Sequence, residues 1–158
     1  MIVISDTSVI TYLIQVDQLL LLKQVFGEVI IPQKVQEELY EIKGQQSIIE
    51  ARKWIKVRQI TNQKLYHEIE EELDGGETES IVLAIELKAD ILLIDEKKGR
   101  RIAEKYGLKI TGLLGILIES KEEGLIKEVK PILDKLIYEI GFRISPKLYQ
   151  EILKIVNE

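Results

Sequence analysis

Short apolar runs that alternate with segments of helical periodicity constrain the fold of this chain most strongly. Runs such as Ile2-Val3-Ile4 and Ile91-Leu92-Leu93-Ile94 carry apolar side chains at consecutive positions, which is typical of strands buried on both faces. Apolar residues spaced i, i+3 and i+4, as at Ile81, Ala84 and Ile85, indicate helices between the runs. Strands separated by helices imply parallel pairing through right-handed crossovers. We therefore expect an α/β fold, a three-layer α/β/α sandwich around a central, mainly parallel sheet.

The expected elements follow from this alternation and from the breaks that Gly and Pro impose. Pro32 begins a helix, and Ser47 with Glu50 three residues later forms a capping-box pattern. Strands are expected at residues 1–5, 29–31, 91–94 and 109–111, with a short edge strand at 55–60. Helices are expected at residues 7–15, 17–26, 33–43, 47–54, 65–73, 77–88, 97–106, 113–121, 127–140 and 146–156.

The chain length of 158 residues suits one ordinary domain with a core of its own. We expect a single domain over residues 1–158, with a core of about 1–125 and a helical extension of about 126–158, hinged near Gly141. The apolar stripe of this extension must pack on the body or on another chain. Its members are Ile144, Leu148, Ile152, Leu153 and Val156.

Composition excludes several classes of protein. The chain has no Cys, so neither a disulfide scaffold nor a thiolate metal site is possible. No apolar run approaches the roughly 18 residues of a membrane span, and the first residues lack the basic segment of a signal peptide, so we expect a cytoplasmic protein without membrane contact. The net charge of -5 disfavours unspecific nucleic-acid binding, so a nucleic-acid role would need a local basic patch or bound cations.

Two carboxylates follow two of the predicted strands directly. Asp6 stands after the run at residues 2–5, and Asp95 stands after the run at 91–94. In open α/β sheets, ligands bind at the carboxyl ends of the strands. Two acids held at that edge repel each other unless a positive group lies between them, and a divalent cation is the simplest candidate.

Two further acids fit the same site. Glu38 lies beside the apolar stripe of its predicted helix, whereas Glu37 points about a third of a turn away, so we expect Glu38 to face inward. Glu77 falls in the first turn of the helix that follows Gly75-Gly76, where the helix dipole favours a carboxylate. Glu79, two residues later, is the alternative to Glu77 as the third acid of the set.

Each acid also has a purely structural explanation. Asp6 and Asp95 could be helix N-caps, Glu77 a charge that complements its helix dipole, and Glu38 a residue of a solvated helix face. Capping alone does not explain Glu38, and it does not explain why all four acids suit one site. The combination therefore favours a functional site over four unrelated structural roles.

The ordered set of motifs resembles the PIN-domain nuclease family, and in particular the branch related to the toxins of VapBC-like toxin–antitoxin pairs. The resemblance spans nearly the whole chain, and it departs from the usual pattern in having Glu at the third acid, where many PIN domains have Asp. The matching motifs are Asp6-Thr7-Ser8, Pro32 with Val35-x-x-Glu38-Leu39, Gly76-Glu77-x-Glu79-Ser80-Ile81, Leu93-Ile94-Asp95, Arg100-Arg101-Ile102-Ala103, Thr111-Gly112-Leu113-Leu114-Gly115 and Gly141-Phe142-Arg143-Ile144-Ser145.

This resemblance implies a Mg²⁺- or Mn²⁺-dependent endoribonuclease, a toxin with a small antitoxin protein as its partner, and a homodimer. The candidate ligands are all carboxylates, and the chain has no Cys and only one His. Such oxygen ligands suit these oxygen-preferring cations. The implied catalytic and metal-binding residues are Asp6, Glu38, Glu77 and Asp95, with Ser8 and Glu79 as secondary candidates. Ser8 could hold a metal-bound water or a phosphate oxygen, or could simply be a hydroxyl at a helix start.

The densest basic stretch follows Asp95. Lys97, Arg100 and Arg101 are the predicted RNA contacts, because RNA binding needs positive charge beside the acids and Arg pairs with phosphate through two hydrogen bonds. A solvated helix face is the structural alternative. For the dimer interface, the apolar segment with Ile10, Leu13 and residues 19–22 is the candidate, unless it simply faces the core.

Two other functions remain open from sequence. An aspartate-dependent phosphotransfer domain on a similar sheet is disfavoured. One such family would carry a second Asp at the position of Ser8, and another would carry an acid at the position of Ser5. A catalytically silent PIN-like module that binds RNA or protein is the second alternative, and the presence of all four acids argues against it.

Overall fold

The computed structural model describes residues 1–158 and contains a five-stranded sheet in which all neighbouring strands are parallel. The strand order is β3-β2-β1-β4-β5, so the stretch predicted as an edge strand does lie at an edge. The predicted α/β fold with a parallel sheet is confirmed. The strands are β1 Val3–Ser5, β2 Val29–Pro32, β3 Ile55–Arg58, β4 Ile91–Leu93 and β5 Ile110–Thr111.

The direction of winding reverses at the central strand. The chain runs outward from β1 through β2 to β3, then crosses back and continues through β4 to β5 on the other side of β1. Ser5 at the end of β1 pairs with Leu93 at the end of β4, which aligns the carboxyl ends of these two strands. Such a reversal point is where open parallel sheets bind ligands.

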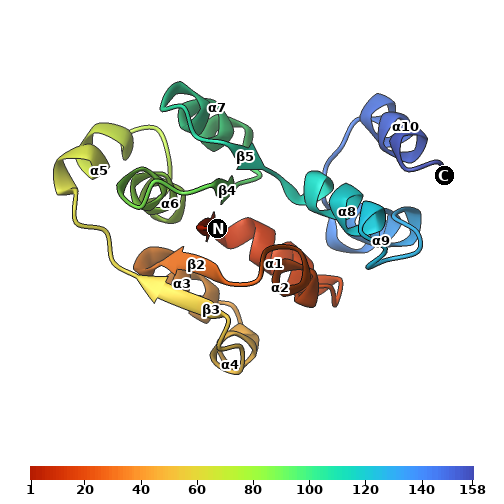
Figure 1. Cartoon of the computed structure of the whole chain (residues 1–158), viewed down its shortest axis with the longest axis horizontal. Helices are drawn as coiled ribbons and strands as arrows, with labels where there is room; N and C mark the ends of the chain where they lie inside the picture. The colour runs from red at the N-terminus through yellow and green to blue at the C-terminus, as the bar shows by residue number, and fades with distance from the viewer.

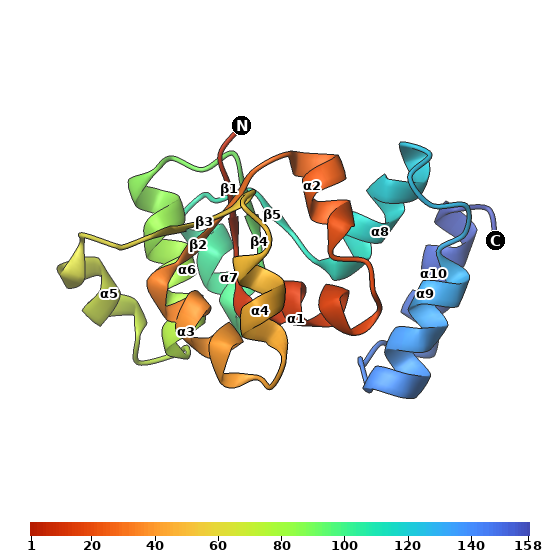
Figure 2. The ribbon, with the colours of Figure 1, turned by 90° about the horizontal axis from the view of Figure 1, so that it is seen from below.

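Helices cover both faces of the sheet, which makes the predicted three layers (Figure 1, Figure 2). Three helices with buried residues in the smaller apolar cluster cover one face: α5 Gln63–Ile69, α6 Gly75–Glu86 and α7 Lys97–Lys105. The helices that contribute to the larger cluster are α1 Thr7–Gln15, α2 Leu20–Phe26, α3 Gln33–Glu41, α4 Gln45–Glu50, α8 Leu113–Glu122, α9 Lys130–Lys135, the π-helix η1 Leu136–Ile140 and α10 Pro146–Ile155.

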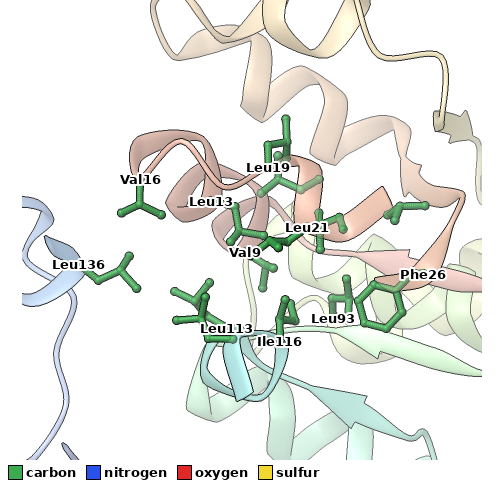
Figure 3. Close-up of a cluster of buried hydrophobic side chains, with 14 of the residues drawn as sticks. Val9, Leu13, Val16, Leu19, Leu21, Phe26, Leu93, Leu113, Ile116 and Leu136 are labelled. Carbon is green, nitrogen blue, oxygen red and sulfur yellow. The ribbon is translucent and has the colours of Figure 1, made fainter. Parts of the chain in front are cut away.

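The two apolar clusters explain why the strands are apolar at consecutive positions. Successive side chains of a strand point to opposite faces, so Val3 joins the larger cluster of 25 buried residues and Ile4 the smaller cluster of 10. Figure 3 shows part of the larger cluster, where Val9 and Leu13 of α1 lie near Leu113 of α8. Burial on both faces holds β1 and β4 rigidly behind the acids that follow them.

The C-terminal helices pack on the body rather than standing free. Ile152, Leu153 and Val156 belong to the larger cluster, so the predicted apolar stripe is mostly buried within the chain. Gly141 ends η1 with a left-handed φ of 88°, a conformation that suits glycine and turns the chain towards α10 at the expected hinge. The Glu158 carboxylate then accepts hydrogen bonds from the backbone N–H groups that precede and open α9, at 2.7 and 2.8 Å.

Several predicted helices differ from the structure in their boundaries, such as the helix expected over 65–73, which is Gln63–Ile69, and two others. The helix expected from Ser47 begins at Gln45 after Gly44, and the Ser47 hydroxyl donates to the Gly44 carbonyl at 3.4 Å instead of capping the helix. The helix expected over 127–140 begins at Lys130 and continues into the π-helical η1. Local patterns do not define these boundaries, because packing against the body decides where each helix begins and ends.

The apolar segment considered as a dimer interface is part of the core. Ile10, Leu13, Leu19, Leu21 and Leu22 are at most 5% exposed, and only Leu20 faces outward. The core-facing alternative therefore holds for these side chains, with Leu20 as the exception. No helix of the chain combines the length and apolar character that crossing a membrane would require.

Candidate metal-binding site

Asp6 lies at the carboxyl end of the central strand and is the N-cap of α1. Its Oδ1 accepts a hydrogen bond from the Thr7 N–H at 2.6 Å, and the Ser8 hydroxyl is 3.5 Å from Oδ2. Asp6 is only 3% exposed. Burial, with the added effect of negative charge on Asp74 and Glu38, raises the pKa of Asp6 to about 7. The capping role is thus real, but it satisfies one oxygen and leaves the second with a single weak contact.

Glu38 faces inward, whereas Glu37 is exposed, as the helical spacing predicts. The Glu38 Oε1 accepts a hydrogen bond from the Thr7 hydroxyl at 2.5 Å, and its Oε2 accepts one from the Gly76 N–H at 3.1 Å. Burial raises the pKa of Glu38. Glu38 therefore connects three elements, because it joins α3 to the residue after Asp6 and to the start of α6.

Glu77 is a buried acid without adequate partners. It is 7% exposed, and its Oε2 is the only buried side-chain nitrogen or oxygen of the chain without a hydrogen-bond partner. Burial, a hydrogen bond with the Asp74 side chain and the negative charge of Asp6 together raise the pKa of Glu77 to about 9. An unpaired buried carboxylate is costly unless a proton or a cation accompanies it.

Glu79 points to a different part of the molecule. Its Oε1 accepts a hydrogen bond from the Lys34 N–H, in the first turn of α3, at 3.0 Å. Glu79 lines a small pocket with Gln33 and Gln63, away from Asp6 and Glu38. Of the two competing acids, Glu77 is therefore the one that the fold brings to Asp6.

Asp74 belongs to the same group, although it is not among the residues predicted for the site from sequence. Its Oδ1 accepts a hydrogen bond from the Glu77 N–H at 2.8 Å, which makes Asp74 the N-cap of α6. The signal was available in the sequence, because an Asp before Gly75-Gly76 and three residues ahead of Glu77 fits an N-cap. Its cap geometry places its side chain beside Glu77.

Three glycines allow the backbone to approach the acids closely. A Cβ on Gly76 would lie 2.1 Å from Oε1 of Glu38, and a Cβ on Gly99 would lie 2.7 Å from Oε2 of Glu77. A Cβ on Gly112 would lie 2.8 Å from Oδ1 of Asp95. Each of these carboxylates therefore occupies space that only a glycine leaves open.

These side chains surround an acidic pocket of about 540 Å³. No Lys, Arg or His lines it. Thr7, Ser8, Thr11 and Tyr12 add hydroxyl groups to its wall. The acids that line it, which we call the acidic pocket residues, are Asp6, Glu38, Glu41, Asp74, Glu77 and Glu96.

Asp95 lies beside the acidic pocket rather than in its wall. Its Oδ1 accepts a hydrogen bond from the Leu113 N–H, the first residue of α8, at 3.1 Å. Burial is the main influence on Asp95 and raises its pKa, against the opposing effect of the Leu113 hydrogen bond and of Arg100. Asp95 shares a neighbouring pocket of about 510 Å³ with Ser8, Tyr12 and Glu96, all of which also line the acidic pocket.

The predicted RNA contacts gather on the other side of Asp95. Lys97, Arg100 and Arg101 of α7 line a pocket of about 600 Å³ together with Asp95. All three side chains are exposed, and none forms an ion pair within the chain. The fold thus places positive charge next to the acids, as expected from the sequence.

The donor chemistry of the acidic pocket fits a hard divalent cation. The available donors are carboxylate and hydroxyl oxygens, and Glu77 offers an oxygen without a partner. Burial, and to a lesser extent the negative charge of neighbouring acids, raises the pKa values of Asp6 and Glu77. In the conformation described, no three acidic or His side chains lie close enough together to hold a metal ion. The acidic pocket therefore suits a divalent cation in its residue types, burial and charge. The side chains that would hold the cation are first of all Asp6, Glu38 and Glu77.

Comparison with models of known protein families finds a match over nearly the whole chain. The model of the family described as "DUF3368: PIN domain" matches residues 2–158. This range includes the acidic pocket residues, Asp95 and the cations of α7. No curated protein and no solved structure matched the chain significantly.

Proposed function

The chain belongs to the PIN-domain family, whose members are generally metal-dependent nucleases, and from this premise we propose that it is a Mg²⁺- or Mn²⁺-dependent endoribonuclease. The observation that carries the proposal is the Glu77 carboxylate, buried and lacking a partner for Oε2 beside Asp6 and Asp74. A purely structural acid would be paired or solvated. A cation that binds there would relieve the repulsion among these side chains.

The proposed roles follow from position. Asp6 and Asp95 end neighbouring strands and would bind the cation directly, while Glu38 and Glu77 would bind it directly or through water, or help deprotonate the attacking water. Thr7 and the Gly76 N–H orient the Glu38 carboxylate, and the Ser8 hydroxyl, 3.5 Å from Oδ2 of Asp6, would contact a water or a phosphate oxygen. When bound, Mg²⁺ or Mn²⁺ supplies a more acidic water, polarises a phosphoryl oxygen and stabilises the leaving oxygen.

Cleavage of a labelled RNA by the purified chain tests the proposal. We expect cleavage with Mn²⁺ or Mg²⁺ and none with EDTA. Asp6→Asn and Asp95→Asn should each lower the rate by more than about 100-fold, because even a partner of a metal ligand contributes roughly 10- to 100-fold. Asn preserves the N-cap of α1, so the Asp6→Asn variant should keep its fold, which circular dichroism can verify.

The control variant is Glu79→Gln, which removes an acid outside the acidic pocket. It should cleave at close to the normal rate. Equal cleavage by all variants would indicate a contaminating nuclease. Absence of both cleavage and cation binding would support the silent RNA- or protein-binding module instead.

We further propose that this nuclease is the toxin of a VapBC-like pair and forms a homodimer. Resemblance to that branch supports both statements. A small adjacent or overlapping reading frame whose product co-purifies with the chain and inhibits cleavage would establish the antitoxin. Light scattering at several concentrations would establish the dimer.

A further inference from the structure

The pocket beside Asp95 is lined by segments that are far apart in the sequence. Lys97, Arg100 and Arg101 come from α7, and Leu114 comes from α8. Residues 142–145, which connect η1 to α10, line the pocket too and contribute Arg143, and the wall is completed by Asp95, Glu104 and Leu148. We call this space of about 600 Å³ the basic pocket. Its existence depends on the C-terminal helices being packed against α8.

The cations of the basic pocket form no ion pairs, although Arg100 lies near enough to Asp95 to favour its charged form. None of Lys97, Arg100, Arg101 and Arg143 forms an ion pair in the chain, and the pocket contains only two acids, Asp95 and Glu104. Four unpaired cations around one hollow are notable in a chain of net charge -5. Such an arrangement favours an anionic ligand, and arginine in particular matches the geometry of phosphate.

The basic pocket continues into the acidic one. Arg143 and Phe142 also line the intermediate pocket of about 510 Å³, whose other wall includes Ser8 and Tyr12. The Phe142 ring packs edge-to-face on Tyr12 with 5.2 Å between ring centroids, which holds the connection against α1. Because Ser8 and Tyr12 also line the acidic pocket, one continuous surface leads from the acids to Arg143.

We infer that Arg143 anchors a phosphate of a single-stranded RNA whose backbone runs from the basic pocket towards the acidic pocket. The inference rests on the proposed nuclease function, because it names how the same site holds its substrate. Single-stranded RNA fits best, since a basic groove with aromatic side chains along it is how proteins bind unpaired strands. Arg143 is distant in sequence from the basic stretch of α7, so only the fold assigns it to this surface.

The test measures RNA binding rather than cleavage. The probe is a fluorescein-labelled single-stranded RNA of about ten nucleotides, the order of one strand-binding site, with EDTA present and salt varied between roughly 50 and 200 mM. Arg143→Ala should weaken binding about 5- to 10-fold at the lowest salt and reduce the slope of log affinity against log salt by about 0.7, the contribution of one phosphate contact to a single strand. Arg143→Lys should recover only part of the affinity, because lysine keeps the charge but not the bidentate contact.

Arg58→Ala is the matched control, because Arg58 is an exposed arginine on the opposite edge strand and lines none of the three pockets. It loses the same charge and should bind RNA nearly as the wild type does. Equal affinities of Arg143→Ala and Arg58→Ala, or no binding by the wild type, would overturn the inference. Equally strong competition by an acidic peptide of the same length would overturn it in favour of a protein ligand.

Failure of this inference differs from failure of the nuclease proposal. Cleavage that depends on Asp6, together with binding that ignores Arg143, would leave the nuclease function intact and remove Arg143 from substrate binding. RNA binding that depends on Arg143, without any cleavage, would keep Arg143 as an RNA contact and remove the nuclease function.

Discussion

The acidic pocket and the basic pocket lie side by side but differ in how their charges are held. Six acids and no base line the first, and two of these, Asp6 and Glu77, are buried. Four cations and two acids line the second, and its cations are exposed to solvent. Solvent screens the charges of the basic pocket, whereas burial prevents this for the two buried acids. The acidic pocket should therefore cost folding stability, and the basic pocket should not.

The proposed function gives a reason for this difference. A cation site gathers several acids at one place in the fold, so repulsion among them is inherent to the arrangement. A strand-binding surface must release and exchange its ligand, and exposed cations on one helix and one connection suffice for it. Substitutions in the acidic pocket, with matched substitutions outside it as controls, test this difference.

The largest expected effect is the pH dependence of stability without metal. The pKa of Asp6 rises from 3.8 unfolded to about 7 folded, so between these values the folded chain binds more protons than the unfolded chain. The free energy of unfolding should therefore fall as pH rises from about 4 to about 7, by up to about 4 kcal/mol for Asp6. Glu77, with its pKa of about 9, should extend the decline towards that pH.

Denaturant unfolding in EDTA at pH 5 and pH 8 measures this effect. Asp6→Asn should be more stable than the wild type at pH 8 and should lose much of the pH dependence. Arg101→Ala, the matched change in the basic pocket, should alter stability by no more than about 0.5 kcal/mol at either pH. If the free energy of unfolding depended equally on pH in the wild type and in Asp6→Asn, the acidic pocket would not be what destabilises the folded chain at high pH.

A slightly smaller effect is expected from cation binding. At pH 8, Mn²⁺ at about 100 times its dissociation constant should stabilise the chain by about 2.7 kcal/mol, because it binds only the folded state. Glu77→Gln should remove most of this gain, and Glu79→Gln should retain it, since the Glu79 carboxylate accepts from the Lys34 N–H outside the pocket. Thermal unfolding with and without Mn²⁺ measures the difference, and the reverse pattern would make Glu79 the third acid.

The smallest expected effect on stability comes from adding a Cβ at Gly76, whose backbone contacts the Glu38 carboxylate. Alanine in a helix is usually more stabilising than glycine by about 1 kcal/mol. Gly76→Ala should instead destabilise by about 2 kcal/mol, because its Cβ would lie 2.1 Å from Oε1 of the hydrogen-bonded Glu38 carboxylate.

The neighbouring Gly75→Ala serves as the control for that variant. Its Cβ would meet the flexible end of Lys34 at 2.9 Å, which can move aside at little cost. Chemical denaturation should therefore separate the two variants by more than about 1 kcal/mol. Similar stabilities would show that the Glu38 carboxylate is not held against Gly76.

Local pattern predicted the positions of the acids at strand ends and helix starts. Asp6 follows β1, Glu77 lies in the first turn of α6, and Glu38 rather than Glu37 faces inward. These positions depend on the periods of strand and helix, which a sequence displays directly. The boundaries of α4 and of α9 with η1 could not be predicted in the same way, because tertiary packing sets them.

The sequence by itself determined the parallel α/β fold and the set of candidate acids, because apolar periodicity and strand ends are local properties of the chain. Only the tertiary structure placed Glu77 rather than Glu79 in the wall of the acidic pocket, added Asp74 to that wall and brought Arg143 beside the cations of α7. It also placed Asp95 in a neighbouring pocket rather than opposite Asp6. The physical reason is that burial, pairing and charge neighbourhood arise from contacts between elements distant in sequence, and no local pattern records them.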